Sequence, residues 1–178
     1  MNPILTIAIP TYNNPRQLHE CLRSLLLYTD YPYKIVVVNN YQDDQEQIGE
    51  MIKATEFQHL SVLQLEENKG WMGGVNAALA QCDTEFFCML NDDVAFLPTR
   101  GTFWRVLIDH FRNPQVAAVG PCSNYVAGVQ SLFEMGTPMA METGLLIGLC
   151  MVLRTDFLQY IGGLDESLVG GDDLDLSI

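Results

Sequence analysis

The chain has 178 residues, the size of one ordinary domain, and its hydrophobic content of 48% is enough to form a folded core. Its formal net charge is −13, so the surface repels nucleic-acid backbones and we expect no nucleic-acid partner. The same charge repels a phosphorylated small molecule, so the binding of such a ligand requires a local cation.

The cysteines and histidines indicate neither a disulfide framework nor a zinc site. Five cysteines are an odd number and form no C-x-x-C pair, which favours reduced core residues in a reducing compartment. The three histidines are widely spaced. The most apolar stretch, residues 144–153, is shorter than the roughly 20 residues that span a bilayer. We therefore expect a cytoplasmic protein, and a peripheral contact with a membrane surface stays open.

Apolar periodicity predicts strands that alternate with helices along the chain. The first helix is expected to start at Pro15 after an Asn14 N-cap. Residues 123–143 are rich in Gly, Met and Ser and predict a long loop over the site. The other predicted strands and helices are, in chain order, 5–10, 34–38, 45–55 (helix), 60–65, a helix through Val75, Ala78 and Leu79, 86–90, 102–111 (helix), 116–119, 148–154 and 155–161 (helix).

This alternation predicts an α/β fold with a mixed, mostly parallel sheet and helices on both faces. We expect residues 1–178 to form a single domain. Such sheets bind ligands beyond the carboxyl ends of their strands. The polar segments that follow the strands are therefore the candidate binding residues: Thr11–Asn13, Asn39–Asn40, Glu66–Asn68 and Asn91–Asp93.

The segment FFCMLNDDV, residues 86–94, carries the strongest local signal. A buried strand runs directly into Asp92 and Asp93 at the binding edge of the sheet. Carboxylates are suitable ligands for Mg²⁺ or Mn²⁺, which keep water and substrate phosphate in their coordination shell. The alternative is that the two aspartates form only a turn.

Two further segments carry weaker signals. Asp172, Asp173 and Asp175 follow a flexible Gly162-Gly163 pair and either supply a general base or place charge at a helix N-terminus. The glycines of ENKGWMGGVNAAL, residues 67–79, predict a turn before the helix through Val75 and allow the backbone to approach a ligand. The segment is neither G-x-G-x-x-G nor a Walker A loop, which disfavours dinucleotide and P-loop functions.

Three side chains near these segments have a functional and a structural interpretation. Lys69 and Arg154 either contact phosphate or sugar or are solvated surface charges. Trp71 either stacks on a ligand or anchors its loop against the core, and we expect the anchor.

Taken together, the segments TIAIPTYNN, IVVVNN, the Asn-x-Gly loop, LNDD, GLCMVLR and GGLDESLVGGDD, in this order, resemble the family 2 glycosyltransferases of GT-A fold. The resemblance covers nearly the whole chain. It implies a Rossmann-like GT-A domain, a nucleotide-sugar donor, Mn²⁺ or Mg²⁺ as the metal, and a glycan, lipid-linked or protein acceptor. The resemblance thus implies a role in polysaccharide or glycan biosynthesis, by metal-dependent transfer of the donor sugar to the acceptor.

The resemblance also implies residue roles. Asn39 stands where the family usually holds an aspartate that accepts a hydrogen bond from the base, and an amide oxygen accepts more weakly. Asp93 matches the metal ligand. Asp172 and Asp173 match the Glu-Asp pair of the family, with Asp173 as the catalytic base. The other implied nucleotide-sugar contacts are Pro10, Thr11, Tyr12, Asn68, Gly70, Asn76, Asn91 and Asp92.

The mechanism implied by the resemblance is an inverting displacement from a nucleotide-diphosphate donor, with a UDP- or dTDP-sugar favoured; a retaining outcome stays open. Related domains continue with acceptor-binding helices beyond the point where this chain stops, so we expect a domain truncated at its C-terminus, a minimal transferase, or one module of a longer protein. Two alternatives stay open at this stage: a catalytically weak nucleotide-sugar-binding module, and a nucleotidyltransferase of similar architecture.

Overall fold

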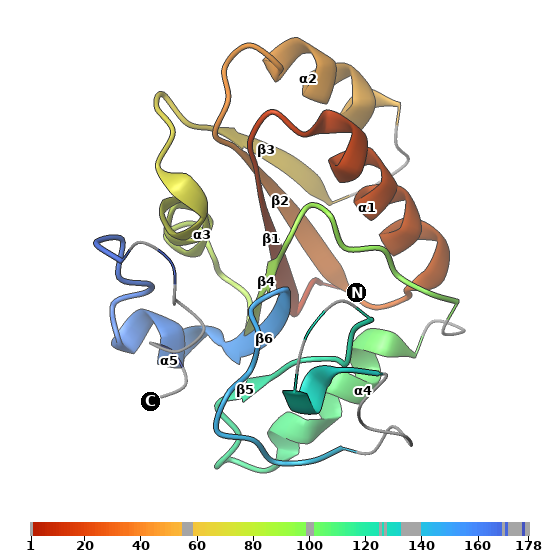
Figure 1. Ribbon diagram of the computed structural model, residues 1–178, viewed down its shortest axis with the longest axis vertical. Helices are drawn as coiled ribbons and strands as arrows, with labels where there is room; N and C mark the ends of the chain where they lie inside the picture. The colour runs from red at the N-terminus through yellow and green to blue at the C-terminus, as the bar shows by residue number, and fades with distance from the viewer. Residues whose placement is uncertain are drawn as a thin grey trace.

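We describe a computed structural model of the protein, which covers residues 2–54, 59–98, 102–124, 126, 128–132, 140–168, 170 and 176. Within these residues, the centre of the fold is a six-stranded sheet with strand order β3-β2-β1-β4-β6-β5 (Figure 1). The strands are β1 Leu5–Thr11, β2 Tyr33–Asn39, β3 Leu60–Gln64, β4 Phe86–Leu90, β5 Ala118–Val119 and β6 Cys150–Arg154.

The strands β1 to β4 are parallel, and β6 runs antiparallel to both β4 and β5. The carboxyl ends of β1, β2 and β3 meet at one edge of the sheet because Thr11 pairs with Asn39 and Asn39 pairs with Gln64. The end of β4 joins them from the other side of β1. The predicted mixed, mostly parallel sheet is therefore confirmed.

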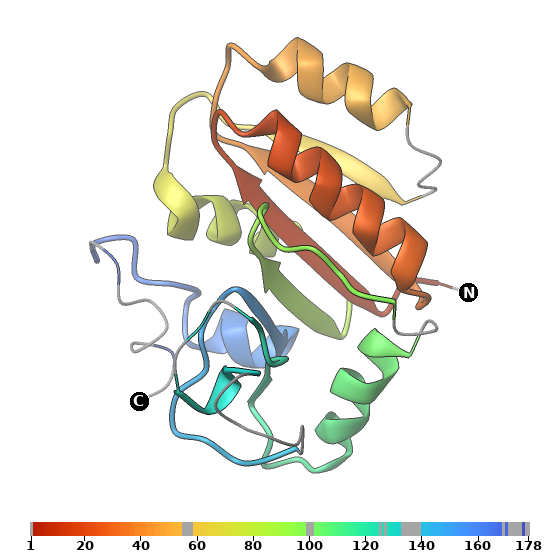
Figure 2. The same cartoon turned by 45° about the vertical axis from the view of Figure 1, so that its right-hand side comes forward.

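Helices cover both faces of the sheet, as expected. On one face lie α1 Pro15–Tyr28, α2 Gln45–Lys53 and α4 Phe103–Asp109, which is followed by the 3₁₀ helix η1 His110–Arg112. On the other face lie α3 Gly70–Leu79 and α5 Thr155–Tyr160. Figure 2 shows α1 crossing its face of the sheet. A second 3₁₀ helix, η2, spans Gly128–Gln130.

Side-chain alternation along the strands divides the core into two layers. Ile7 and Ile9 of β1 pack with α1 and α2, whereas Ala8 between them packs with α3. The same alternation holds for β4, where Cys88 faces one layer and Met89 the other. All of these residues are fully buried. Continuous apolar strands of this kind are required when both faces of a sheet are covered.

The glycine-rich segment differs from its prediction as a turn. Helix α3 already begins at Gly70, so Gly73 and Gly74 are helical. Gly70 has a φ of +69°, which favours glycine at the start of this helix. A Cβ at Gly74 would lie 3.0 Å from the Cβ of Pro10. This glycine therefore serves the close packing of α3 against the end of β1.

The remaining predicted boundaries agree with the structure to within about two residues. The strand predicted at 116–119 is limited to Ala118–Val119, because only these residues pair with β6. Part of the predicted loop at 123–143 lies outside the described residues, and its described part contains η2. None of the helices in the described part of the chain has the length and apolar character that a membrane span requires.

Candidate active site

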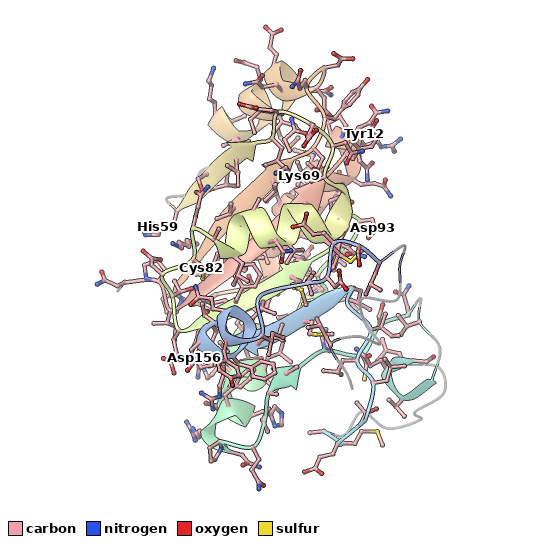
Figure 3. The ribbon with its side chains drawn as sticks, turned by 90° about the vertical axis from the view of Figure 1, so that its left-hand side faces the viewer. Tyr12, His59, Lys69, Cys82, Asp93 and Asp156 are labelled. Atoms are coloured by element: carbon pink, nitrogen blue, oxygen red, sulfur yellow. The ribbon has the colours of Figure 1, made fainter. Side chains whose placement is uncertain are left out.

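The polar side chains that follow the parallel strands gather at one edge of the sheet. Thr11 ends β1, Asn39 ends β2, and Asn91 to Asp93 follow β4. Figure 3 shows Tyr12 and Asp93 toward this end of the strands and His59, Cys82 and Asp156 toward the other end. This edge is where a parallel α/β sheet binds ligands.

Asp92 is turned toward β1 and the start of α1. The Thr11 hydroxyl donates a hydrogen bond of 2.7 Å to Asp92 Oδ2, and the Asn14 side chain also bonds to this carboxylate. Asn14 is the N-cap residue of α1, which begins at Pro15 as predicted, although the Asn14 side chain makes no cap hydrogen bond. Burial raises the pKa of Asp92 above its usual value; the two hydrogen bonds oppose this rise, and neighbouring Asp93 adds to it.

Asp93 faces away from that network. Its side chain is exposed and lines a cavity of about 1200 Å³, together with Asn91. The backbone N–H of Asn91 donates to the Leu149 carbonyl at 3.0 Å, which ties the end of β4 to the segment before β6. The two adjacent carboxylates therefore point to different surroundings, one toward β1 and one toward the cavity.

The carboxylate pair is chemically suited to a hard divalent cation. Burial and mutual repulsion both disfavour the charge on Asp92, and a nearby cation would relieve both effects. Among the described residues, no group of three His, Cys, Asp or Glu side chains is arranged to hold a metal ion. A protein contribution of one or two carboxylates fits Mg²⁺ or Mn²⁺, which complete their coordination shell with water and substrate phosphate.

Asn39 lies at the centre of a buried polar network. Its Nδ2 donates to Gln64 Oε1 at 2.9 Å and to Asp44 Oδ1 at 3.2 Å, and its Oδ1 accepts from the Tyr41 backbone N–H at 3.0 Å. The Gln64 amide is held in turn because its Nε2 donates to the backbone carbonyls of Asn39 and Leu65. The orientation of the Asn39 amide is therefore fixed, and one lone pair of its oxygen is left over.

Asp44 adds an unusual feature to this network. Its side chain is buried, and its Oδ2 atom has no hydrogen-bond partner. The residue precedes α2 but makes no side-chain cap bond. Sequence reasoning missed Asp44 because an aspartate before a helix is read as an N-cap. It also missed Gln64, since a polar residue at the end of a strand gives no sign of its partner.

The turn between β3 and α3 is held by two asparagine side chains. Asn68 Oδ1 accepts from the Gly70 backbone N–H at 2.8 Å. Asn40 accepts from the Lys69 backbone N–H at 3.1 Å and donates to the Gly70 carbonyl at 3.3 Å. These bonds place the start of α3 against the ends of β1 and β2. Asn40 carries no predicted role, although it belongs to a segment singled out as a candidate.

Asn76, within α3, is bonded to a distant part of the chain. It donates to the Leu164 carbonyl and accepts from the Leu164 backbone N–H, both at 2.9 Å, and it also donates to Glu166. Gly163, with a φ of +84°, lets the chain pass so close that a Cβ there would lie 2.5 Å from Asn76 Oδ1. Asn76 thus fixes the segment that leads toward the acidic cluster. Asp172, Asp173 and Asp175 themselves lie outside the described residues.

The aromatic and basic candidates divide between the two ends of the sheet. Tyr12 is half exposed and packs edge to face on Tyr41, with ring centroids 5.1 Å apart. Trp71 is half-buried against the α3 core layer and also lines the cavity, so the structure supports the anchor and allows a ligand contact. Arg154 pairs with Phe86 at the opposite end of β4 and donates to the Phe111 carbonyl, so it does not reach the site. Lys69 is exposed near the start of α3 (Figure 3).

The family model of glycosyl transferase family 2 matches residues 6–153, which is most of the chain. The chain belongs to glycosyl transferase family 2. This family 2 member is 27% identical to the pre-mycofactocin glycosyltransferase of Mycobacterium tuberculosis, over 97% of its own length and 38% of that protein.

Solved structures with the same fold agree with this assignment. The mannosyltransferase PcManGT from Pyrobaculum calidifontis, in complex with GDP-Man and Mn²⁺, superposes with a TM-score of 0.77 at 22% identity, over 97% of this chain and 50% of that one. The S. aureus TarS fragment 1-349 in complex with UDP superposes with a TM-score of 0.73 at 25% identity, over 99% of this chain and 54% of that one. The predicted GT-A fold is confirmed. The family 2 member spans about half the length of these structures and 38% of the curated relative.

Proposed function

We propose that this family 2 member transfers a sugar from a nucleotide-diphosphate donor to the hydroxyl of an acceptor, and that residues 1–178 form one glycosyltransferase domain. The observation that carries the proposal is the placement of Asp92, bonded to Thr11, and of the adjacent Asp93 at the edge where β1, β2 and β4 end. A carboxylate pair at this edge of a family 2 domain suits a metal-bound diphosphate. The solved relatives support the ligand class, since they are complexes with UDP and with GDP-Man and Mn²⁺.

The donor side of the site is assigned to the residues at the ends of β1 and β2. Tyr12, half exposed beside Tyr41, offers an aromatic face to a base. The family motif assigns Asn39 to the base, and its Oδ1 accepts one hydrogen bond in this structure, but its side chain is fully buried. The neighbouring side chains would therefore have to move before Asn39 accepts from the ring N–H of uracil or thymine, the contact that favours a UDP- or dTDP-sugar. Pro10 and Thr11, at the end of β1, are assigned to the floor of the donor site. Asn68 and Gly70 are assigned to its border at the start of α3.

The chemistry follows from the residues beside the diphosphate. Asp93, exposed at the cavity, is the proposed ligand of Mn²⁺ or Mg²⁺, which when bound offsets the charge that develops on the leaving phosphate. Asp92, held by Thr11, positions the turn that carries Asp93. Asn91 anchors this turn through its bond to Leu149.

The proposed catalytic base is Asp173, with Asp172 beside it; both assignments come from the family motif. Asp173 takes the proton of the acceptor hydroxyl while the oxygen of that hydroxyl bonds to the anomeric carbon. The bond from that carbon to phosphate breaks, and the nucleoside diphosphate leaves with inversion. The proton moves within the transition state, because an ordinary carboxyl pKa of about 4 is too low to deprotonate a sugar hydroxyl beforehand, and such a base contributes about 10²- to 10⁴-fold.

A thermal-shift panel tests the donor and metal assignments together. UDP, dTDP, GDP and CMP are each added with and without Mn²⁺, and a ligand that binds the native state raises the melting temperature. We expect the largest shift for UDP or dTDP with Mn²⁺. Asp93→Ala should remove the metal-dependent part of that shift. The control Asp156→Ala makes the same charge change at the far end of the sheet and should retain it (Figure 3).

The same protein, supplied with a UDP- or dTDP-sugar, separates the proposal from its alternatives. Release of nucleoside diphosphate from that sugar nucleotide in the presence of Mn²⁺ supports a transferase, whereas binding without any release would favour a binding module. Release of pyrophosphate from a nucleoside triphosphate would point to a nucleotidyltransferase. A metal-dependent shift that survives Asp93→Ala would refute Asp93 as the metal ligand.

A further inference from the structure

The cavity beside Asp93 has an apolar wall that the donor chemistry does not use. Its volume of about 1200 Å³ exceeds the roughly 300–1,000 Å³ of a typical small-molecule pocket. Thr11, Tyr12 and Asn39, the donor-side residues, are not among its lining residues. The cavity extends instead from Asn91 and Asp93 toward β6, α4 and η2, which Figure 1 shows on the other side of β4 from β1.

The lining of this cavity is mostly aliphatic and aromatic. Its apolar residues include Val94, Phe96, Leu97, Phe103, Leu132 and Leu149. Leu97 is 69% exposed and Leu132 is 40% exposed, so large apolar side chains are left in contact with solvent at the cavity. Apolar area left exposed in a concave site is typical of a ligand site, because its burial by a ligand is favourable.

The charge of the lining excludes one class of occupant. The sequence holds nine Lys and Arg against 22 Asp and Glu, and no Lys or Arg lines the described part of the cavity. Its charged lining residue is Asp93, and its other polar side chains include Gln17, Asn91 and Asn124. The cation proposed at Asp93 would be neutralised by the diphosphate of the donor, so an acceptor that carries phosphate or carboxylate would meet repulsion here without a further cation.

We propose that the acceptor of this enzyme is an uncharged amphiphile, a hydroxyl-bearing group attached to an apolar alkyl or aryl part. The inference rests on the proposed function. The hydroxyl lies at the Asn91 and Asp93 end of the cavity, where the diphosphate and the anomeric carbon of the donor meet. The apolar part lies against the wall formed by Phe96, Leu97 and Leu132. A free polysaccharide or a phosphate-bearing polymer lacks this match.

Calorimetry with three probes tests the inference. Hexyl β-glucoside and methyl β-glucoside share one sugar and differ only in their alkyl chain, and glucose 6-phosphate carries an anion. We expect hexyl β-glucoside to bind about 30-fold more tightly than methyl β-glucoside, which corresponds to removing half of the added methylene surface from water. Its binding should show a negative heat-capacity change. Glucose 6-phosphate should not bind.

A pair of matched variants assigns the binding to the cavity. Leu97→Gln alters a lining residue, and Leu27→Gln makes the same change at an exposed leucine of α1 that is not among the lining residues. Leu97→Gln should weaken hexyl β-glucoside by about five-fold and leave the methyl glucoside unaffected, since roughly half of one leucine contact is lost. Leu27→Gln should change neither. Equal affinity of both variants for hexyl β-glucoside would overturn the inference.

UDP binding with Mn²⁺, measured on the same preparations, distinguishes a failure of the acceptor class from a failure of the proposed function. Wild-type protein could bind UDP and yet bind hexyl β-glucoside, methyl β-glucoside and glucose 6-phosphate equally. That result would overturn the acceptor class and leave the transferase proposal standing. Protein that binds no nucleotide at all would overturn the proposed function and, with it, the assignment of the cavity to an acceptor. Binding of both UDP and hexyl β-glucoside supports the inference.

Discussion

Asn39→Asp is the substitution whose outcome the structure specifies most closely. It places at position 39 the carboxylate that the resemblance leads one to expect there. In this chain, however, the atom replaced is Nδ2, which donates to Gln64 Oε1 at 2.9 Å and to Asp44 Oδ1 at 3.2 Å. The introduced oxygen would face two acceptors. Gln64 is not free to turn its amide, because its Nε2 is bonded to two backbone carbonyls.

The size of the effect follows from these distances. Two full charges at 3.2 Å and an effective dielectric constant of about 20 repel by about 5 kcal/mol. The variant avoids this cost by keeping a proton on the introduced carboxyl, which at pH 7 costs about 4 kcal/mol for an ordinary pKa of about 4. One buried hydrogen bond worth about 1 kcal/mol is lost in either case. With some relaxation, we expect the free energy of unfolding to fall by about 3 kcal/mol at pH 7.

The pH dependence of this loss has a defined sign. Repulsion raises the folded-state pKa of the introduced carboxyl above its unfolded value of about 3.9, so the folded state holds a proton that the unfolded state releases. The penalty is therefore absent below the unfolded pKa and grows as the pH rises through the folded pKa. The deficit relative to wild type should shrink between pH 7 and pH 5, toward the single lost hydrogen bond.

Urea unfolding at both pH values, followed by tryptophan fluorescence, measures the prediction. The matched control is the double variant Asn39→Asp/Asp44→Asn, which restores a donor and an acceptor across the 3.2 Å contact. It should recover about 2 kcal/mol of the loss at pH 7, as a coupling between neighbouring residues. A single variant as stable as wild type at pH 7, or a deficit that does not change with pH, would refute the assigned orientation of the Asn39 amide.

Three further predictions follow from other contacts. Asn76→Ala leaves the Leu164 N–H and carbonyl without their partner and should lower the free energy of unfolding by about 2–3 kcal/mol in urea titrations; a change within 0.5 kcal/mol would be inconsistent with the bonds described. The bond from Lys34 holds the pKa of the exposed Asp83 below its usual value, so Asp83→Asn should lower the melting temperature slightly at pH 7, and this difference should vanish as the pH falls through the carboxyl range or when salt is raised. Asp173→Asn should abolish turnover while leaving the nucleotide-induced thermal shift intact, and loss of both would argue against its role as the base.

The placement of the site residues at one edge was predictable from the sequence. Thr11, Asn39 and Asp93 each stand just after an apolar run, and runs of this length in alternation with helices form a parallel sheet. Parallel strands bring their carboxyl ends together whatever side chains follow them. The same local order of motifs was enough to indicate family 2 and the GT-A fold.

The beginning of α3 shows where local reasoning failed. Glycines predict a turn because they weaken helices, yet Gly73 and Gly74 are helical. Gly74 allows α3 to pack against Pro10, a contact with another element that no pattern within the segment contains. Arg154 is a second example, since its place at the far end of the sheet depends on β6 running antiparallel to β4.

Local sequence patterns specify the elements, their order and the polar residues at the strand ends, because hydrophobic periodicity and turn chemistry act between near neighbours. The direction in which those residues face depends on contacts between distant segments. Asp92 turns toward Thr11 and Asp93 toward the cavity, although they are adjacent. Asn76 bonds to Leu164, 88 residues away in the sequence. Hydrogen-bond partners of this kind are chosen by the packing of distant segments, and their direction is set once the core has formed.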